Sequence, residues 1–437
     1  MTAGEGAMPQ QSAPSASDMA RRIKAILAGS SGNLVEWFDF YAYSAFALYF
    51  SKSFFPDGDQ TAQLLGTAGI FATGFLMRPL GAWYFGRLAD RHGRRLALTR
   101  SILLMCLGSG LIAATPAYAT IGVFAPFMLL LARLIQGFSL GGEYGTSATY
   151  LSEMATADRR GFYSSFQYVT LIGGQLCAML VLLVLQKLVL TPAQLDAWGW
   201  RIPFVIGALL AVLVFGFRRN MHETAAYEGA TRRDGSLREL MKHPREVLTV
   251  IGLTLGGSIG FYTYTTYMQK FLVNTAGFPK DTVTVISVAA LFLFMAFQPL
   301  VGALSDSIGR RPVLIFYGAV GALLTVPLLT TLQSTRDPWT AFLLVVSALT
   351  VLTGYTSINA VVKAELFPVH VRALGVGLPY ALTQAVFGGT AEYVALWLKQ
   401  AGVEHYFYWY VASAIFISLL VYIRMPETRQ TSAIETN

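Results

Sequence analysis

Five charged residues interrupt long apolar stretches in the first half of this 437-residue chain, namely Glu36, Asp39, Arg78, Arg133 and Glu143. A charge at the centre of a membrane helix costs about 2.5–3.5 kcal/mol on insertion scales, so such residues usually pair or serve a function. Arginine grips a carboxylate through a bidentate fork. A carboxylate withdrawn from water holds its proton more readily than an exposed one. These residue types therefore predict a site that binds a carboxylate-bearing anion and carries protons.

Residue spacing places these charges on shared helix faces. Glu36 and Asp39 are three residues apart and Tyr43 follows four residues later, so all three share one face. Arg133 and Gln136 share a face of another helix in the same way. Without substrate, Arg133 is expected to be neutralised by Glu36 or Asp39. The alternative role for each charge is an ion pair that fixes helix packing.

Depth along the helices narrows the roles. At about 1.5 Å per residue, Glu36, Asp39 and Arg133 fall near the bilayer midplane, and Arg78 and Glu143 lie nearer the cytoplasmic end. None of the five histidines falls inside an apolar stretch. Proton coupling is therefore expected to rest on carboxylates: Glu36, Asp39 and Glu143.

The second half offers polar side chains in place of charges. These residues could close a cavity from the opposite wall, although most tyrosines in a membrane protein serve packing. The candidates are Tyr262, Tyr264, Tyr267, Gln269, Asn359, Tyr380 and Gln384. The full set expected to bind substrate is Arg78, Arg133, Gln136, Tyr264, Tyr267 and Gln384.

The elements that must position these residues are membrane helices. Hydrophobic residues make up 54% of the chain and charged residues 13%, against about 25% charged in soluble domains. Twelve apolar stretches approach the length of about 20 residues that a spanning helix needs. They cover 25–51, 62–86, 96–115, 121–149, 162–186, 201–217, 247–269, 282–305, 313–332, 339–362, 373–398 and 405–423.

The net charge of +8 is explained by orientation in the membrane. Of the 32 lysines and arginines, we assign 23, Lys363 and Arg372 among them, to the tails and even-numbered gaps. Six, including Lys270, are assigned to the other face. The positive-inside rule then places both termini in the cytoplasm. No nucleic-acid partner is implied.

An internal repeat divides the chain into two homologous halves. The pattern G-x-x-x-D-x-x-G-R-R at 86–95 returns at 302–311, and Ser152-Glu153 is echoed by Ala364-Glu365. Internal repeats are typical of secondary transporters. We expect a disordered cytoplasmic tail (1–23), a six-helix half (24–217), a cytoplasmic linker (218–246), a second six-helix half (247–424) and a short cytoplasmic tail (425–437).

The repeated loops are candidates for a gate. Their glycines allow tight turns, and their aspartates can sit against the N-terminus of a neighbouring helix. Their arginines can pair with Glu153 and Glu365, locking the halves together at the cytoplasmic rim. The alternative is surface charge that only sets topology. The expected gate residues are Gly86, Asp90, Arg91, Arg94, Glu153, Asp306, Arg310 and Glu365.

Other classes of function find no support. Cys106 and Cys177 both fall in apolar stretches, so neither a disulfide framework nor a metal site is expected. No catalytic triad or cofactor loop is present, which argues against an enzyme and against a bound cofactor. Drug antiport predicts a proline-rich fifth helix, and the stretch 162–186 has no proline. A sensor would need an appended signalling domain, and both tails are short.

Several blocks resemble the metabolite:H+ symporter family of the major facilitator superfamily. They are Ser31–Tyr41, Gly74–Pro79 and Ala132–Tyr144. The resemblance implies twelve transmembrane helices in two pseudo-symmetric halves, working as a monomer in the bacterial inner membrane. It also implies that Arg78 and Arg133 bind substrate carboxylates and that the acidic residues couple protons. Members carry shikimate, citrate, proline and betaine, or 2-oxoglutarate.

Three further blocks, Gly161–Gln175, Phe261–Lys270 and Phe387–Leu396, resemble the 2-oxoglutarate carriers of that family in particular. The resemblance therefore implies proton-coupled import of 2-oxoglutarate by alternating access. The alternatives are citrate, another dicarboxylate or shikimate as the substrate of the same mechanism.

Overall fold

The structure is a computed structural model that describes residues 16–92, 94–141, 143–156, 158–219 and 237–434. Side chains of residues 16–32, and of several residues within 86–98, 142–157 and 217–219, lie outside the described set. Within these limits the chain is helical throughout and contains no strand.

The first half consists of six long helical stretches with short connecting helices. In chain order they are α1 (Ala16–Phe54), α2 (Gln60–Leu76) with α3 (Arg78–His92), α4 (Arg94–Ala114), α5 (Tyr118–Ile121), α6 (Phe124–Leu140) with α7 (Glu143–Met154), α8 (Arg160–Val184) with the π-turn η1 (Leu185–Val189), α9 (Pro192–Ala197) with the 3-10 turn η2 (Gly199–Arg201), and α10 (Ile202–Arg219).

The second half repeats this plan and adds two π-turns inside its long helices. Its elements are α12 (Leu237–Leu240), α13 (Pro244–Phe261) with η3 (Tyr262–Tyr267) and α14 (Met268–Asn274), α15 (Lys280–Ile308), α16 (Arg310–Ser334), α17 (Pro338–Thr356) with α18 (Asn359–Leu366), α19 (Arg372–Thr383) with η4 (Gln384–Gly388) and α20 (Ala391–Gln400), and α21 (His405–Arg424).

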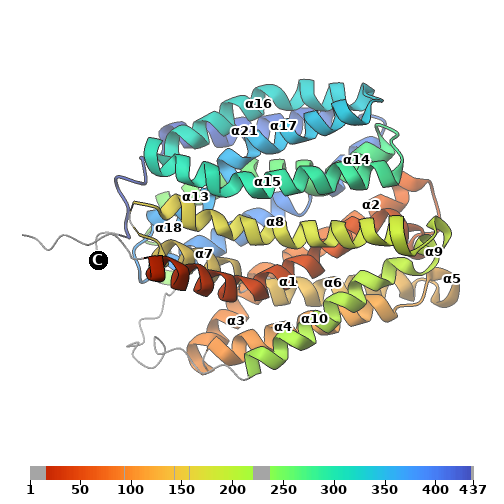
Figure 1. Cartoon of the computed structure of the whole chain (residues 1–437), viewed down its shortest axis with the longest axis horizontal. Coiled ribbons are helices and arrows are strands. Elements are labelled where there is room, and N and C mark those ends of the chain that lie inside the picture. The colour runs from red at the N-terminus through yellow and green to blue at the C-terminus, as the bar shows by residue number, and fades with distance from the viewer. Residues whose placement is uncertain (1–15, 93, 142, 157, 220–236, 435–437) are drawn as a thin grey trace, which may run out of the picture.

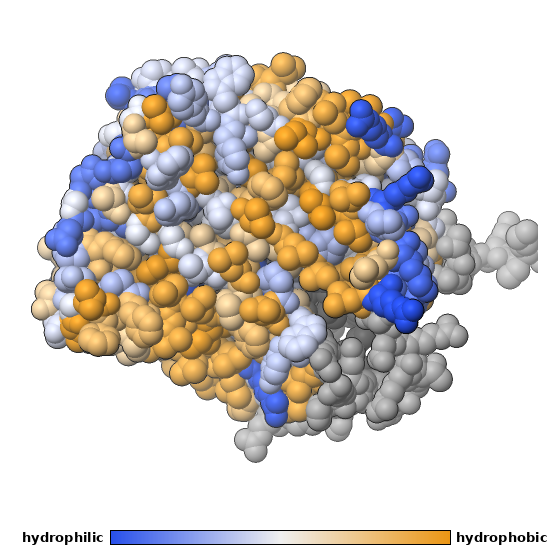
Figure 2. All heavy atoms as spheres, turned by 180° about the vertical axis from the view of Figure 1, so that it is seen from behind, coloured by the Kyte–Doolittle hydropathy of each residue, from blue (hydrophilic) through white to orange (hydrophobic). Residues whose placement is uncertain are grey.

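Length and composition identify the membrane-crossing elements. Among the described residues, eight helices are long and apolar enough to cross a bilayer, and two more (Thr99–Ala114 and Phe124–Leu140) are apolar but shorter. Figure 2 shows apolar side chains spread over the middle of one face, with hydrophilic ones concentrated toward its two ends. An all-α membrane fold is thus confirmed.

Helices extend into two of the expected connecting segments. Helix α1 begins at Ala16, so residues 16–23, expected in a disordered tail, are helical. The expected linker 218–246 also contains helix: α10 ends at Arg219, α12 occupies Leu237–Leu240 and α13 begins at Pro244. Proline suits the first turn of a helix, because its missing N–H has no intrahelical partner there. Linker residues 220–236 lie outside the described residues.

The two halves lie side by side, with α8 of the first half against α15 of the second (Figure 1). Helix α2 likewise packs against α20, and α7 against α19. We call the face where α1 begins and α21 ends the terminal face, and the other the opposite face. A Cβ atom on Gly161 would lie 2.4 Å from the carbonyl oxygen of Gly302, so glycine allows α8 and α15 to meet backbone to backbone.

Side chains join the halves at the opposite face. Lys187 of η1 forms an ion pair of 2.7 Å with Asp281 of α15. Asn274 of α14 donates a hydrogen bond of 3.1 Å to Thr61 of α2. These contacts join the halves at the opposite face, in addition to the contact of α8 with α15.

Candidate functional site

The two arginines of the first half are buried among aromatic rings. Arg133 of α6 is 0% exposed, and Arg78, the first residue of α3, is 4% exposed. The Arg78 guanidinium lies 4.0 Å from the ring centre of Phe75 and 4.5 Å from that of Phe40. The Arg133 guanidinium lies 4.4 Å from the same Phe40 ring and 4.6 Å from that of Tyr43. Aromatic faces attract cations, so these rings hold both guanidinium groups in place.

Several donors of these two arginines have no acceptor within the described part of the chain. Nε and Nη2 of Arg78, and Nε and Nη2 of Arg133, are buried and make no hydrogen bond to any described residue. Because both guanidinium carbons are near the Phe40 ring centre, they lie at most 8.9 Å apart. Buried donors without partners are costly, and such groups call for an explanation. A bound anion supplies one.

A hydrogen-bonded relay connects Arg133 to Asp39 of α1. Arg133 Nη1 donates to Gln136 Oε1 at 2.7 Å, and Gln136 Nε2 donates to Asp39 Oδ2 at 2.8 Å. Ser109 of α4 donates to the other Asp39 oxygen. Arg133 was expected to be neutralised by Glu36 or Asp39; toward Asp39, the Gln136 amide lies between the two charges. A Cβ atom on Gly207 would clash with the Asp39 carboxylate, so α10 packs directly against Asp39.

The remaining two acidic candidates are less well defined. Glu36 is fully buried in α1, one turn before Asp39. The side chain of Glu143, at the start of α7, lies outside the described residues.

Two of the expected second-half residues lie away from the arginines. The Tyr264 hydroxyl forms a hydrogen bond of 2.8 Å with Thr325 of α16, inside the second half. The Tyr267 hydroxyl donates to Glu404 at 3.2 Å, near the opposite face. η3 is a π-helical turn, which changes the direction of each side chain relative to a regular α-helix.

The same π-turn directs Tyr262 to the arginines instead. Its ring packs edge-on against Phe75 with 5.2 Å between ring centres, and its hydroxyl lies beside Tyr41 and the Arg78 guanidinium. Gln384, which was expected at the site, lies in η4 beside the Tyr262 ring, across Gly388. Its buried Oε1 has no partner among the described residues.

Sequence reasoning misplaced two lysines. Lys270 and Lys363 were assigned to loops at the two faces, yet both are 0% exposed. Lys270 forms an ion pair of 3.2 Å with Glu392 of α20 and donates to Ser44 of α1. A buried lysine differs from a loop lysine in that its four-carbon stem packs against the apolar surface of neighbouring helices. This packing is seen in the structure and cannot be read from the sequence.

The second repeated loop joins the two halves at the terminal face. Asp306 accepts hydrogen bonds from the backbone N–H groups of Gly161 (2.7 Å) and Phe162 (2.9 Å), at the N-terminus of α8. Arg310 pairs with Asp306 at 2.7 Å and reaches Glu365 at 3.5 Å. An aspartate at a helix N-terminus is favoured by the helix dipole.

Glu153 forms the other bridge at this face. It pairs at 2.6 Å with Arg372 of α19, in the opposite half. The expected gate residues of the first loop (Gly86, Asp90, Arg91 and Arg94) have side chains outside the described residues.

The segment after α21 also packs on the terminal face. Glu427 accepts from the backbone N–H groups of Arg310 and Arg311, each at 2.9 Å, and so caps α16. Thr428 donates to Glu365 at 2.6 Å, and Ser432 accepts from Arg160 of the first half at 3.3 Å. This segment therefore touches both halves.

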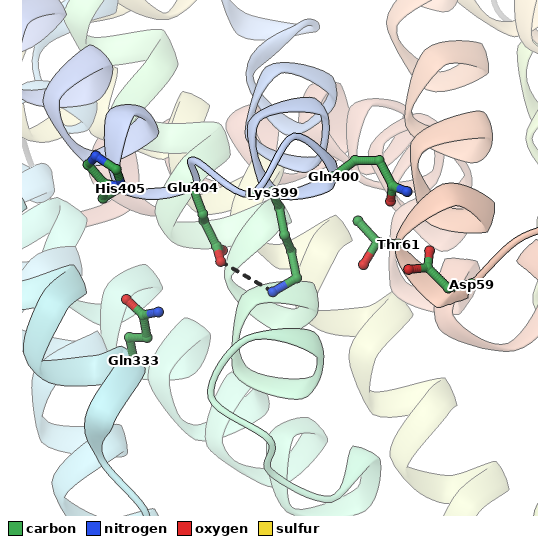
Figure 3. Close-up of a pocket in the computed structure, with 8 residues that line it drawn as sticks. Asp59, Thr61, Gln333, Lys399, Gln400, Glu404 and His405 are labelled. Atoms are coloured by element: carbon green, nitrogen blue, oxygen red, sulfur yellow. Dashed lines mark hydrogen bonds and ion pairs between the residues drawn. The ribbon is translucent and has the colours of Figure 1, made fainter.

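A pocket of 340 Å³ opens at the opposite face, where α2 begins and α20 meets α21 (Figure 3). Its rim carries Asp59, Lys399, Glu404 and His405, and Lys399 pairs with Glu404 at 3.2 Å. Tyr267 is linked to this pocket through Glu404.

Comparison with known proteins identifies the architecture. The model of the Major Facilitator Superfamily matches residues 30–391. The chain belongs to this superfamily. The proton:xylose symporter XylE bound to 6-bromo-6-deoxy-D-glucose superposes with a TM-score of 0.76 at 18% identity, covering 95% of this chain and 98% of XylE. A major facilitator fold of twelve helices in two halves is thereby confirmed.

Relatives within the superfamily are transporters. The chain is 55% identical to the alpha-ketoglutarate permease of Escherichia coli (strain K12), over 95% of this chain and 96% of the permease. It is 36% identical to the citrate-proton symporter of Klebsiella pneumoniae, over 84% of this chain and 83% of the symporter. This major facilitator protein is therefore a transporter and not an enzyme, and a multi-pass protein of the inner membrane.

Proposed function

We propose that this protein imports 2-oxoglutarate together with protons, by alternating access, as a monomer with both termini in the cytoplasm. The 55% identity to an alpha-ketoglutarate permease supports the substrate. The concentration of lysine and arginine in the tails and even-numbered gaps supports the orientation. The terminal face is then the cytoplasmic one.

The observation that carries the proposal is the pair of buried arginines with unused donors. Arg78 and Arg133 each keep Nε and Nη2 available, which is the edge of a guanidinium that grips a carboxylate. The two carboxyl carbons of 2-oxoglutarate are separated by four bonds of about 1.5 Å, or about 5 Å when extended. Two guanidinium carbons at most 8.9 Å apart suit such a dianion.

Citrate is the second candidate substrate. The 36% identity to a citrate-proton symporter favours it over solutes without several carboxylates. Arg78 and Arg133 alone do not distinguish a dicarboxylate from a tricarboxylate. A competition assay with unlabelled substrates distinguishes them.

Electrical work explains why protons accompany the anion. Moving a dianion into a cell that is 100 mV negative inside costs about 4.6 kcal/mol, at about 2.3 kcal/mol per charge. Two accompanying protons remove this cost. We propose Asp39 as the main proton carrier because Gln136 links it to Arg133, so its charge state and substrate binding affect the same amide. Glu36 and Glu143 are proposed to assist.

The gate is proposed to open by separation of α8 and α15 at the terminal face. That movement would break the hydrogen bonds from Gly161 and Phe162 to Asp306 and the pair between Glu153 and Arg372. Arg310 and Glu365 would hold Asp306 ready for the return. Gly86, Asp90, Arg91 and Arg94 are proposed to act in the same way on the symmetry-related side.

Uptake of radiolabelled 2-oxoglutarate into proteoliposomes, with and without an inward proton gradient, tests the function. Unlabelled succinate, citrate, shikimate and proline compete in parallel. Uptake should depend on the gradient and be blocked chiefly by unlabelled 2-oxoglutarate. Stronger competition by citrate would make citrate the substrate and leave the proposed mechanism unchanged. Uptake that does not depend on the gradient would exclude proton coupling.

Arg133→Ala tests the site itself. It removes the guanidinium at the centre of the relay, so the affinity for 2-oxoglutarate should fall at least a hundredfold. Arg100→Ala, which removes an exposed arginine of α4, is the matched control and should bind normally. Wild-type affinity in Arg133→Ala would remove this residue from the substrate site.

A further inference from the structure

Lys363 of α18 is a buried lysine that the arginine site does not use. It lies three residues before the end of α18, on the terminal-face side of the chain, and is 0% exposed. Among the described residues its ammonium has no carboxylate partner. The other buried lysine, Lys270, is neutralised by Glu392. A buried membrane charge without a counter-charge indicates a functional site.

Polar and aromatic groups from both halves surround this ammonium. Asn359 Oδ1 accepts from Lys363 Nζ at 2.9 Å, and the Tyr144 hydroxyl, from the first half, accepts at 3.4 Å. The Tyr380 ring lies 4.2 Å from Nζ and stacks on the Tyr144 ring with 3.6 Å between centres. Lys363 therefore occupies a built site at the contact between the halves, not a gap in packing.

Within the described part of the chain, this environment leaves the lysine incompletely satisfied. An ammonium has three N–H donors, and two have acceptors here, Asn359 and Tyr144. Neutral acceptors and ring faces attract a cation but do not cancel its charge. A carboxylate would both accept the third hydrogen and neutralise the charge.

A line of polar side chains runs from Lys363 back to the arginines. The Tyr380 hydroxyl lies beside Gln384 and Tyr168. Gln384 adjoins the Tyr262 ring, and the Tyr262 hydroxyl lies beside Arg78. An anion leaving the arginines toward the terminal face would thus meet hydroxyl and amide groups before it met Lys363.

We propose that Lys363, with Tyr144, Asn359 and Tyr380, is a second carboxylate-binding site, which takes one carboxylate of a dicarboxylate from the arginine pair as the anion moves toward the terminal face. The inference rests on the proposed function and adds a cation of the second half to it. Because residues of both halves form the site, it is complete only while the two halves are in contact around Lys363. When the terminal face opens, Tyr144 moves away from Lys363 and the anion is released.

Equilibrium binding to the purified full-length protein in lipid nanodiscs tests this proposal. The probes are 2-oxoglutarate, succinate, glutarate and citrate, and the variants are Lys363→Met, Lys363→Arg and Lys242→Met. Lys363→Met should weaken binding of the best probe at least tenfold. Lys242→Met makes the same change at an exposed lysine (64% exposed) and should bind like wild type. An affinity of Lys363→Met within twofold of wild type overturns the proposal.

Lys363→Arg retains a positive charge but changes its position. It provides a second test if Lys363→Met does not fold. The ratio of the succinate and glutarate dissociation constants should change at least threefold, because these anions differ by one methylene in length. A purely structural lysine would leave this ratio unchanged, and that result also overturns the proposal. If wild type prefers citrate to 2-oxoglutarate, the proposed substrate fails while the Lys363 comparison proceeds with citrate.

Discussion

At the scale of single residues, Gln136 determines how the site responds to a proton. Its amide accepts from Arg133 and donates to Asp39, so neither charge contacts the other directly. A neutral Asp39 attracts the amide N–H less strongly than a carboxylate does. Protonation of Asp39 therefore loosens the amide and leaves Arg133 more available to an anion. We propose that this arrangement couples a proton on Asp39 and an anion at Arg133 through the Gln136 side chain.

Asp39→Asn should separate substrate binding from proton coupling. Asparagine resembles the protonated carboxyl group in shape and charge, so binding and exchange of 2-oxoglutarate should remain within about threefold of wild type. Accumulation against a gradient should be lost, because no proton can leave the residue. Exchange and gradient-driven uptake in the same proteoliposomes measure both properties. Asp158→Asn, at an exposed carboxylate (74% exposed), is the control, and undiminished uphill uptake by Asp39→Asn would exclude Asp39 from the proton path.

The sequence predicted the first-half site better than the second-half wall, for a physical reason. Arg78, Arg133 and Asp39 stand out because charges are rare inside apolar stretches. Lys363 lies near the end of such a stretch and close to Arg372, where a lysine is normally a loop charge. Nothing in the spacing of its neighbours indicates that α18 continues past it in a buried position.

At the scale of helices, glycines permit the contact that closes the terminal face. A Cβ on Gly161 would lie 2.4 Å from the Gly302 carbonyl oxygen, 2.5 Å from Ser305 Oγ and 2.7 Å from Arg310 Nη1. Backbone atoms cannot move aside as side chains do. The Asp306 hydrogen bonds to the start of α8 depend on the same close approach.

Gly161→Ala should therefore hold the terminal face open and reduce transport at least tenfold. Gly110→Ala is the matched control, because a Cβ there meets no atom within 4 Å. Spin labels at the exposed positions Arg159 and Ser307, in a background without Cys106 and Cys177, report the separation of the halves by pulsed electron resonance. The distance distribution should shift to longer values in Gly161→Ala alone. Normal uptake with an unchanged distribution would show that this contact does not limit closure.

Helix positions were predictable from the sequence and helix irregularities were not. The stretch 282–305 corresponds to α15 (Lys280–Ile308), and 405–423 to α21 (His405–Arg424), because span length follows bilayer thickness. The π-turn η3 has no comparable signal: its hydrogen-bond pattern depends on how α13 packs on its neighbours. That turn directs Tyr262 to Arg78 and leads Tyr264 to Thr325.

At the scale of the whole molecule, a buried charge pair of the second half positions a hydrogen bond to the first half, whereas an exposed pair between the halves contributes little. Lys270 of α14 and Glu392 of α20 belong to the second half, and Lys270 donates to Ser44 in the first. Both charges are almost completely buried. By contrast, the pair of Lys187 with Asp281 is about half exposed, and such pairs are worth about 0–1 kcal/mol.

Glu392→Gln should destabilise the protein strongly, because it leaves Lys270 buried without its counter-charge. Removing one partner of a buried pair typically costs about 3–5 kcal/mol, whereas replacing both by apolar residues is often neutral. The double variant Lys270→Met/Glu392→Met should therefore unfold close to the wild-type temperature, although it loses the link to Ser44. Asp196→Asn, which breaks the part-exposed pairs with Lys52 and Lys280, should change stability by about 1 kcal/mol at most. Thermal unfolding followed by tryptophan fluorescence compares all three variants. A double variant as unstable as Glu392→Gln alone would mean that Glu392 stabilises the fold through packing and not through the charge of Lys270.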